Sequence, residues 1–507
     1  PVPSSGRAIA ATAERDIVVD SPLYTVRLTN RGARIVSWQL KRYRDDEGRP
    51  LQLVSDAGAK IGVLPLQLQL EDEEATRALR DGLYRVERAE HEEGGARITE
   101  LTFTWSNGAG LGAIKTLRLA DDSYLAHLTV TATRGGRPVD PAILWGAGFG
   151  SHNGLENGRF ADAAMAVLNL GEKTEIRAAS SIKTDAPWLQ AGTIRWSGLA
   201  DKYFAAVLIP PGPSAGEVRA VSHRLIEDGR EHFFLSLGLQ VPGVSRFDLF
   251  VGPKDYDLLK TAGLGLDRLL NFGFFGVVAR PLFYALKFVE RYVGNWGWAI
   301  IILTVFIRLL FFPITHRSQV NMKKMQEKMK RVQPKVKSMR ERYRKLERKE
   351  VERGNVGARH KLRQKMNEEM MALYKEEGIN PLGGMSGCLP LLLQMPILYA
   401  FYTILSIAIE LRKAPFLLWI KDLSHKDPYY VTPIVMGVSM LAQQMMTSGS
   451  IADPAQRKMM YLMPVMFTYF FINLPSGLVL YWLVNNLLGI VQQHLINKQV
   501  AAEAEAA

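Results

Sequence analysis

Residues 296–313, with the sequence WGWAIIILTVFIRLLFFP, carry one charged side chain, the guanidinium of Arg308. An apolar run of this length is typical of a helix that crosses a hydrocarbon core of roughly 30 Å. A charge near the middle of such a helix costs about 3 kcal/mol or more, so it normally faces a polar cavity or a partner. This stretch therefore predicts both a membrane span and a candidate polar site inside it.

Four more apolar stretches follow downstream and predict further spans. Together with the first, the five predicted spans are residues 294–315, 388–411, 430–447, 459–474 and 477–496. A span normally needs about 20 apolar residues; the third and fourth fall short of that, which favours a locally thinned bilayer. The simplest role for any one polar residue inside a span is a hydrogen bond between two helices. Taken together, these residues predict a shared hydrophilic interior. Its candidate lining is Arg308, Thr304, Gln444, Tyr469, Trp482 and Asn485, and further polar residues are Gln394, Gln443 and Asn486.

Two interpretations of Arg308 stay open at this level. Thr304 lies four residues earlier on the same helical face, which favours a wet side to the helix. Alternatively, the guanidinium snorkels to the cytosolic headgroups along its aliphatic stem. The third, fourth and fifth predicted spans contain no Asp or Glu, and Glu410 lies at the outer end of the second. A guanidinium without a resident counter-ion needs water or a visiting anionic group, which suits a site for acidic or polar peptide.

The segment between the first two spans, residues 316–377, sets the predicted orientation. It carries about 20 Lys and Arg against about nine Asp and Glu, and basic loops stay on the cytosolic side. The first span then runs from outside to inside. This places residues 21–258 and the loop 412–429 outside, and the loop 448–458 and the tail 497–507 in the cytosol.

The same basic segment predicts a helical hairpin. Its two apolar stripes are Val332, Val336, Met339, Tyr343 and Leu346, and Leu362, Met366, Met370 and Leu373, with a Gly-rich turn at residues 354–357. Packing of the two helices on each other is the simplest use of those stripes. Methionine also adapts to varied hydrophobic partners, so recruitment of nascent chain is a second interpretation. Its candidate residues are Met325, Met329, Met339, Met366 and Met370.

Upstream of the spans, the pattern is that of β-strands. Leu101, Phe103 and Trp105 alternate with threonines, and turn-forming residues such as Asn107-Gly108 separate the runs. Many short strands at this length predict a large antiparallel β-sandwich over residues 21–258. Residues 1–20 are expected to be a linker that follows a first transmembrane helix absent from this sequence.

Residues 263–292 change character again. Arg280, Tyr284, Lys287 and Arg291 share one face of an otherwise aliphatic and aromatic stretch. A helix of this kind prefers to lie in the membrane interface. The alternative is a core helix of the β domain.

Composition and motifs argue against several classes of function. The net charge is +13, and the single cysteine, Cys388, rules out an intrachain disulfide. The sequence has no P-loop, no HExxH, no paired-cysteine metal motif, no Gly-rich dinucleotide loop and no GxSxG elbow. We therefore expect no enzyme, no metal site, no cofactor and no DNA partner.

Several strings occur in order between the predicted spans: NPLGGM at 380–385, LLLQMP at 391–396, APFLLWIKDL at 414–423, DPYY at 427–430, PVMF at 464–467 and PSGLVLYW at 475–482. In these strings, about the last 210 residues resemble the YidC/Oxa1/Alb3 family of membrane protein insertases. The first part looks like the large periplasmic domain of Gram-negative members, a β-supersandwich. The expected protein thus has an extracytoplasmic antiparallel β-supersandwich, an interfacial amphipathic helix, a five-helix transmembrane bundle and a cytosolic helical hairpin.

The resemblance implies an insertase and chaperone of the bacterial inner membrane. Such a protein inserts and folds nascent membrane proteins through a hydrophilic groove around Arg308, without nucleotide hydrolysis. Hydrophobic substrate segments would slide into lipid along the second and fourth spans. The implied partners are nascent membrane proteins, the anionic bilayer, a Sec-type translocon, and the ribosome with the signal recognition machinery.

Two rival functions stay open. A channel or solute transporter would need a continuous path or an inverted repeat, and the sequence displays neither. A membrane-anchored carbohydrate-binding or carbohydrate-modifying protein is suggested by the large outer β domain, although a fold does not decide a function.

Deletion of residues 25–240 separates the insertase from the carbohydrate protein. We expect most insertion activity to survive, because Arg308 and the predicted spans lie outside that segment. Membrane integration of a single-span substrate measures this. Complete loss of activity, in a deletion variant that still reaches the membrane, would place the function in the β domain instead.

Overall fold

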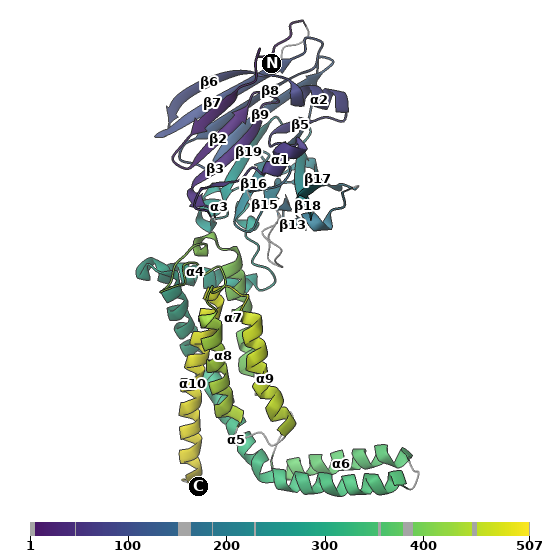
Figure 1. The fold of residues 1–507 in the computed structure, drawn as a ribbon, viewed down its shortest axis with the longest axis vertical. Coiled ribbons are helices and arrows are strands. Elements are labelled where there is room, and N and C mark those ends of the chain that lie inside the picture. The colour runs from purple at the N-terminus through teal and green to yellow at the C-terminus, as the bar shows by residue number, and fades with distance from the viewer. Residues whose placement is uncertain are drawn as a thin grey trace. The chain divides into compact units, whose positions relative to one another are not determined.

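The chain divides into two compact units, residues 1–270 and 271–507. The computed structural model describes residues 6–45, 47–150, 164–184, 186–227, 230–352, 356–378, 389–448 and 454–505. The first unit holds the strands and the second holds the long helices (Figure 1). Cys388, the NPLGGM string and residues 354 and 355 of the predicted turn lie outside the described residues.

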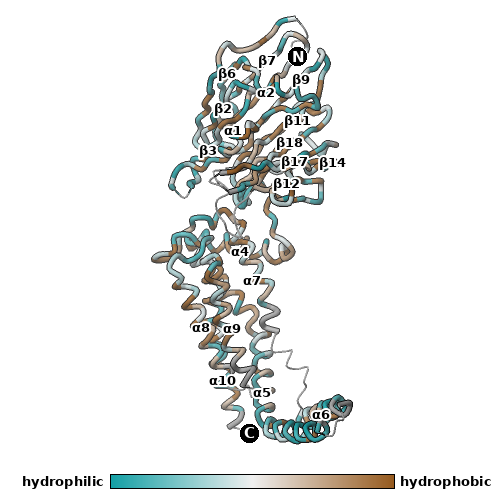
Figure 2. The backbone as a smooth tube through the Cα atoms, turned by 45° about the vertical axis from the view of Figure 1, so that its right-hand side comes forward, coloured by the Kyte–Doolittle hydropathy of each residue, from teal (hydrophilic) through white to brown (hydrophobic). Residues whose placement is uncertain are grey.

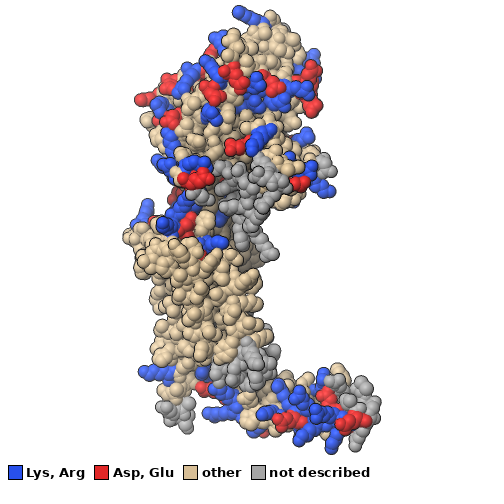
Figure 3. Space-filling model, viewed as in Figure 1, with Lys and Arg blue, Asp and Glu red and all other residues tan. Residues whose placement is uncertain are grey.

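The two units differ in how polar residues are distributed. Lys, Arg, Asp and Glu are scattered over the face of the first unit that Figure 3 displays. In the second unit, the middle of the helices is largely brown in Figure 2 and free of charged residues on the face seen in Figure 3. Within the second unit, charge gathers at the ends of the helices and on the hairpin. An apolar face with charge gathered at its ends is the distribution that a membrane environment selects.

The first unit is built from three antiparallel sheets. The four-stranded sheet runs β1-β2-β3-β4, with β1 (Asp16–Asp20), β2 (Tyr24–Thr29), β3 (Arg34–Arg44) and β4 (Pro50–Gln52). The ten-stranded sheet runs β13-β12-β15-β16-β19-β9-β8-β7-β6, with β10 beside β9. Its strands are β6 (Arg85–Glu93), β7 (Ala96–Ser106), β8 (Gly112–Ala120), β9 (Leu125–Arg134), β10 (Arg137–Val139), β12 (Met165–Leu170), β13 (Lys173–Ala178), β15 (Trp196–Ala200), β16 (Phe204–Ile209) and β19 (Arg246–Pro253).

The five-stranded sheet runs β14-β17-β18-β11-β5. Its strands are β5 (Gln67–Gln69), β11 (Ala142–Trp145), β14 (Trp188–Ile194), β17 (Ser214–Glu227) and β18 (Arg230–Gln240). It packs on the ten-stranded sheet where β14 and β18 meet β12 and β15. The short elements α1 (Asp56–Ile61), α2 (Glu73–Asp81) and η1 (Ala179–Ser181) complete the connections. The predicted antiparallel β domain is confirmed in this outline.

Alternation of side chains explains the packing of these strands. In β7, Leu101, Phe103 and Trp105 are buried as predicted, while the intervening threonines are half-buried. By contrast, β15 and β16 are buried along their whole length. Strands covered on both faces read as continuous apolar runs rather than as alternation.

The four-stranded sheet begins earlier than predicted, inside the expected linker at residues 1–20. In β1, Ile17 and Val19 are buried against the sheet while Asp16 and Asp20 face solvent. An alternation of five residues is too short to be distinguished from a linker by pattern alone. Pairing with β2 is what makes this segment a strand.

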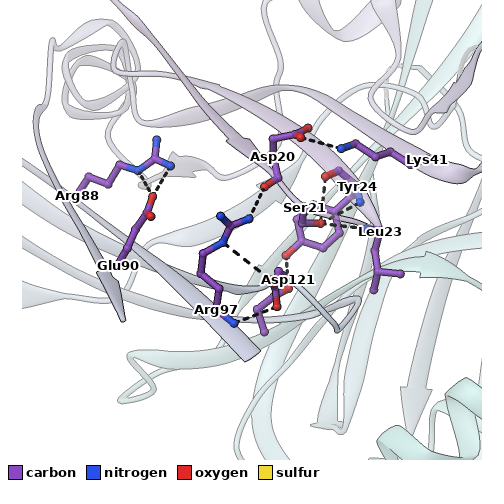
Figure 4. Close-up of polar contacts among 10 residues, drawn as sticks. Asp20, Ser21, Leu23, Tyr24, Lys41, Arg88, Glu90, Arg97 and Asp121 are labelled. Carbon is purple, nitrogen blue, oxygen red and sulfur yellow. Dashed lines mark hydrogen bonds and ion pairs between the residues drawn. The ribbon is translucent and has the colours of Figure 1, made fainter. Parts of the chain in front are cut away.

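The turn between β1 and β2 ties two sheets together (Figure 4). The Ser21 hydroxyl accepts the backbone N–H groups of Leu23 and Tyr24 at 3.2 and 3.0 Å. The Tyr24 hydroxyl donates to the carbonyl of Ala120 in β8 at 2.6 Å, and Arg97 of β7 donates to the Asp20 carbonyl at 3.3 Å. The four-stranded sheet is thereby fastened to the ten-stranded one.

The structure differs from the predicted single helix at residues 263–292. The helix α3 (Tyr256–Ala262) and the turn η2 (Leu266–Leu269) belong to the first unit, and only α4 (Gly276–Val293) follows as a regular helix. Gly263 and Gly265 adopt positive φ angles, which interrupt a helix. Trp196 donates its indole N–H to the Gly265 carbonyl at 3.2 Å, so this part is fixed to the β domain.

The second unit contains long helices. They are α4, α5 (Trp296–Glu352), α6 (Val356–Glu376), α7 (Leu389–Ile407), the turn η4 (Ile409–Leu411), α8 (Val431–Ser448), α9 (Pro454–Phe471) and α10 (Ser476–Glu505). α10 packs against α5 and α8, α9 packs against α8, and α4 packs against α5 and α7. Within the described residues, α5 is the one helix long and apolar enough to cross a membrane, while Gln394–Ile407, Val431–Met446 and Met459–Phe471 are apolar but shorter.

The helix α5 does not end at the predicted boundary near residue 315. It continues through Pro313 and Pro334 to Glu352. Pro313 removes one backbone donor from the helix, and in the same turn the Thr315 hydroxyl donates to the carbonyls of Phe311 and Phe312 at 3.0 and 3.2 Å. The hairpin is therefore a direct continuation of the first predicted span.

Lys115 is the most deeply buried cation of the first unit among the described residues. Its ammonium donates to the carbonyls of Gly32, Ala33 and Leu66 at 2.7, 3.0 and 2.6 Å. Burial away from water lowers the pKa of Lys115, and three acceptors for three N–H donors compensate the charged form. Ala33 and Leu66 both have positive φ angles, so this lysine holds two strained turns in place.

We predict that Lys115→Met lowers the free energy of unfolding of the first unit by about 2–3 kcal/mol, because it leaves three buried carbonyls unpaired. Lys41→Met is the matched control, since Lys41 pairs with Asp20 at 2.8 Å on the surface, where ion pairs contribute about 0–1 kcal/mol. Hydrogen exchange of β8 amides at increasing urea measures both. Equal effects of the two substitutions would contradict the assigned role of Lys115.

Candidate functional site

Arg308 meets groups from two other helices. A Cβ atom placed on Gly489 of α10 would lie 2.9 Å from Nη2 of Arg308 and 2.6 Å from Nε2 of Gln443 in α8. Arg308 is half-buried, and its Nε is buried without a hydrogen-bond partner among the described residues. Nor does it form an ion pair within that part of the chain. A guanidinium in this position can still donate to a visiting acceptor.

Gly489 is what permits this convergence. Any side chain at this position would run into both the guanidinium and the Gln443 amide. The glycine sits inside a regular helix, where it costs about 1 kcal/mol relative to alanine. Its use here is steric, because it brings the α10 backbone close to two polar groups. Sequence reasoning places Gln443 among the polar span residues but gives no reason to single out Gly489.

The next polar layer joins α10 to α8. Asn485 and Asn486 are both buried. Asn486 donates its amide N–H to the Ser439 hydroxyl at 3.4 Å, and Ser439 in turn donates to the Met436 carbonyl at 2.6 Å. The predicted site residue Asn485 is buried one helical turn before Gly489, beside Asn486 in the sequence.

The polar line continues along α5 and α10 toward their C-terminal ends. Gln492 donates its amide N–H to the Thr315 hydroxyl at 3.3 Å, and its buried carbonyl oxygen has no partner within the described residues. The same is true of the side-chain oxygen of Gln319. Further on, His316 and Gln499 share a hydrogen bond of 3.1 Å. The spacing of seven from Asn485 to Gln492 to Gln499 is the sequence signal for this line.

The N-terminal halves of the same helices are apolar and closely packed. Gly477 of α10 lies against Leu405, Leu423 and Ile300, all of which are buried or nearly so. The rings of Phe401 and Tyr481 stack with centroids 4.5 Å apart. The helix cluster is thus largely apolar at one end, whereas toward the other end polar contacts from Arg308 to Gln499 stand beside a small apolar core of Val320, Ile496 and Val500.

The remaining predicted site residues lie in different surroundings. Thr304 is buried, and its hydroxyl donates to the Ile300 carbonyl at 2.6 Å, so it is satisfied within its own helix. Trp482 is buried and stacks on Phe467 of α9. Gln444 is half-buried, and Tyr469 is 71% exposed on α9. Neither is among the residues that meet Arg308 in the described contacts.

The hairpin forms a small core of its own. Val332 and Val336 are buried, and Met325, Met329 and Met370 pack against them together with Leu373 and Tyr374. Lys335 pairs with Glu377 at 2.7 Å, Arg363 pairs with Glu347 at 3.2 Å, and Arg342 pairs with Glu369. Three of the five candidate recruitment methionines therefore contribute to the packing of the two helices, while Met339 and Met366 are half-buried outside that cluster.

These contacts define the chemistry of the site. Among the described residues no cluster of His, Cys, Asp or Glu could hold a metal ion. Glu410, which follows the C-terminal end of α7, pairs with Lys287 of α4 at 3.2 Å. Amides, hydroxyls and one guanidinium can hold polar or anionic peptide by hydrogen bonds and charge, but they supply neither a nucleophile nor a proton relay.

Comparison with known proteins covers the whole chain. The family described as 60Kd inner membrane protein matches residues 288–503, and the YidC periplasmic domain family matches residues 16–285. A membrane protein insertase YidC of Geobacter sulfurreducens is 39% identical over 502 residues, covering 96% of this chain and 87% of the relative. That of Geobacter metallireducens is 37% identical over 526 residues, covering 100% and 90%.

We predict that Gly489→Val destabilises the helical unit by about 1–3 kcal/mol, as overpacking does elsewhere. Leu487→Val is the matched control, because it places the same β-branched residue on the same helix at an exposed position. Thermal unfolding in detergent measures the difference. A shift no larger for Gly489→Val than for Leu487→Val would contradict the close approach of α10 to Arg308 and Gln443.

Proposed function

Because the chain belongs to the family of the membrane protein insertase YidC, we propose that it inserts membrane proteins through the polar site around Arg308. It is an inner-membrane protein with a periplasmic β domain. The observation that carries the proposal is the approach of Gln443 and Gly489 to Nη2 of Arg308, whose Nε is buried without a partner in the described chain.

We propose that α5, α7, α8, α9 and α10 cross the membrane, with the C-terminus and the hairpin in the cytosol. The basic residues of the hairpin support this orientation. The N-terminal ends of α5 and α10 then face the periplasm. The apolar, packed half of the cluster is the periplasmic half, and the polar line from Arg308 to Gln492 opens toward the cytosol.

This asymmetry suggests how insertion is catalysed. A polar outer segment of a substrate loses hydration when it crosses hydrocarbon, and each unsatisfied backbone group costs several kcal/mol there. A polar site reached from the cytosol carries that segment part of the way in hydrated form. Only the packed outer half remains to be crossed, so the barrier falls without nucleotide hydrolysis or covalent chemistry.

The hydrophobic part of the substrate needs a lateral route to lipid. On α9, Tyr469 and its neighbour Phe470 are exposed, as are Val465 and Met466 one turn earlier. An exposed aromatic and aliphatic face along α9, together with α7, suits the sliding of a transmembrane segment. In this scheme Tyr469 belongs to the lipid-facing route and not to the lining around Arg308.

The hairpin has a separate proposed role in receiving substrate. Its exposed basic side chains suit anionic lipid headgroups or ribosomal RNA. Met339 and Met366, which lie outside the hairpin core, offer adaptable apolar contacts for nascent chain. Cooperation with a Sec-type translocon, with the ribosome and signal recognition machinery, and a chaperone role, belong to the same proposal.

We predict that Arg308→Ala slows insertion of a substrate with an acidic outer tail by about tenfold more than insertion of its neutral-tailed counterpart, since an attraction of about 1.4 kcal/mol is a factor of ten in rate. Arg308→Lys should keep much of the activity, because a single positive charge is what the attraction requires. Protease protection of the tail in proteoliposomes measures the rates.

Arg291→Ala is the matched control for that comparison. It removes an exposed positive charge from α4, outside the site, and should leave the ratio of acidic to neutral substrates unchanged. Equal slowing of both substrates by Arg308→Ala, or no slowing, would contradict the recruitment of acidic tails by Arg308.

A further inference from the structure

The segment between η4 and α8, residues 412–430, is fixed to the N-terminal ends of three helices. At α5, the ring of Phe416 lies against Gly297 and meets Trp298 edge-on with centroids 5.8 Å apart. Asn295, which caps α5, donates its side-chain N–H to the Pro415 carbonyl at 3.1 Å. The segment is therefore pinned to the start of the first span.

Two further attachments hold the same segment. At α10, the backbone N–H of Gly477 donates to the Leu423 carbonyl at 3.0 Å, and Ser476 donates its hydroxyl to the Asp422 carbonyl at 3.0 Å. At α8, Asp427 accepts the backbone N–H and the hydroxyl of Thr432 at 2.8 and 2.7 Å. Burial alone would raise the pKa of Asp427, but these hydrogen bonds outweigh it and hold the pKa below its usual value.

A tight turn at residues 416–420 projects from this fixed frame. The backbone N–H of Phe416 donates to the Ile420 carbonyl at 2.9 Å. Phe416 packs on α5, Ile420 is buried, and the Trp419 ring meets that of Tyr429 with centroids 6.4 Å apart. The two side chains between Phe416 and Trp419 point away from the rest of the helical unit: Leu417 is 47% exposed and Leu418 is 85% exposed.

Leu418 occupies a backbone conformation that leucine disfavours. Its φ angle is +54°, in the left-handed region where glycine and asparagine are the usual residues. A leucine there is strained, and exposure to water adds the cost of solvating its apolar surface. The described part of the chain gives no compensating burial. An outlier of this kind indicates that the side chain is used by something outside the protein.

The surroundings of the turn point to lipid. Trp298 on α5 and Val431, Ile434 and Val435 on α8 are exposed apolar residues near the same helix ends, where the membrane interface lies if these helices span the bilayer. Aromatic residues concentrate at that level. Lys421, one residue beyond the turn, is exposed and is placed to meet phosphate groups.

We propose that the turn carrying Leu417 and Leu418 inserts into the outer leaflet, at the boundary between headgroups and acyl chains. The membrane level of the turn rests on the spans proposed above. The turn fixes the depth at which the N-terminal ends of α5, α8 and α10 lie, because the segment 412–430 that carries it is attached to all three. This anchor is separate from α4, because α4 precedes α7 in the sequence and the turn follows α7.

A polarity-sensitive fluorophore tests the proposal in the full chain in proteoliposomes. The only cysteine is replaced by Cys388→Ser, and a single label is attached through Leu418→Cys. We expect a blue-shifted emission, quenching by lipids brominated near the headgroup end of their acyl chains, and weak quenching by aqueous iodide. The matched control is Asp122→Cys in the exposed turn between β8 and β9, which should respond only to iodide.

Two results would overturn the proposal. Iodide quenching at position 418 equal to that at 122 would place the turn in water. Protection from both quenchers would show that protein, either the β domain or a partner, covers Leu418.

Because a label could disturb the turn, a second probe at Leu417→Cys is compared with and without Leu418→Asn. Asparagine tolerates the backbone conformation, so the fold is kept while quenching by brominated lipid should fall; unchanged quenching would contradict insertion of Leu418. Failure of insertion activity with lipid quenching intact would count against the proposed function and not against the anchor.

Discussion

The helical unit depends on one constraint: a guanidinium sits in the apolar part of α5 with no acid beside it in the described chain. A charge in that position requires polar groups around it, because burying it without partners costs free energy. Gln443 provides an amide close to the guanidinium, and Gly489 lacks the side chain that would collide with both groups. Neither neutralises Arg308. Its charge has no ion pair in the described chain, and this suits the proposed binding of acidic or polar peptide.

The same constraint explains why the two ends of the helix cluster differ. Toward the N-terminal ends of the helices, Gly477 of α10 lies against Leu405 and Ile300, and Gly297 of α5 lies against Phe416. Because neither glycine carries a side chain, these apolar groups pack closely. From Arg308 onward, amide and hydroxyl contacts appear between the helices, beside the small apolar core of Val320, Ile496 and Val500. The proposed mechanism assigns hydration to this polar side and exclusion of water to the apolar half. Insertion by lowering a solvation barrier needs both properties in one protein.

The sequence predicts the strands, the helices and Arg308 better than it predicts which residues of neighbouring helices are in contact. A charge inside an apolar run identifies Arg308 directly, and the alternation in β7 is correctly placed. The facing partners are less accessible, because which side of α8 or α10 meets Arg308 depends on helix rotation. Gln443 rather than Gln444 lies beside the guanidinium, Thr304 is satisfied within its own helix, and Tyr469 is exposed. Pro313 suggests a helix end, yet α5 continues through it to Glu352. Gly263 and Gly265 divide a stretch whose composition predicts one helix.

Insertion into bare lipid tests the central claim most directly. The purified chain is reconstituted in proteoliposomes without any nucleotide, and a single-span substrate with an acidic outer tail is added. The account predicts protease protection of that tail above the level in empty liposomes, with the gain reduced by Arg308→Ala. No gain over empty liposomes, with a substrate that does not insert unaided, would contradict intrinsic insertase activity and leave the protein to act only beside another translocon.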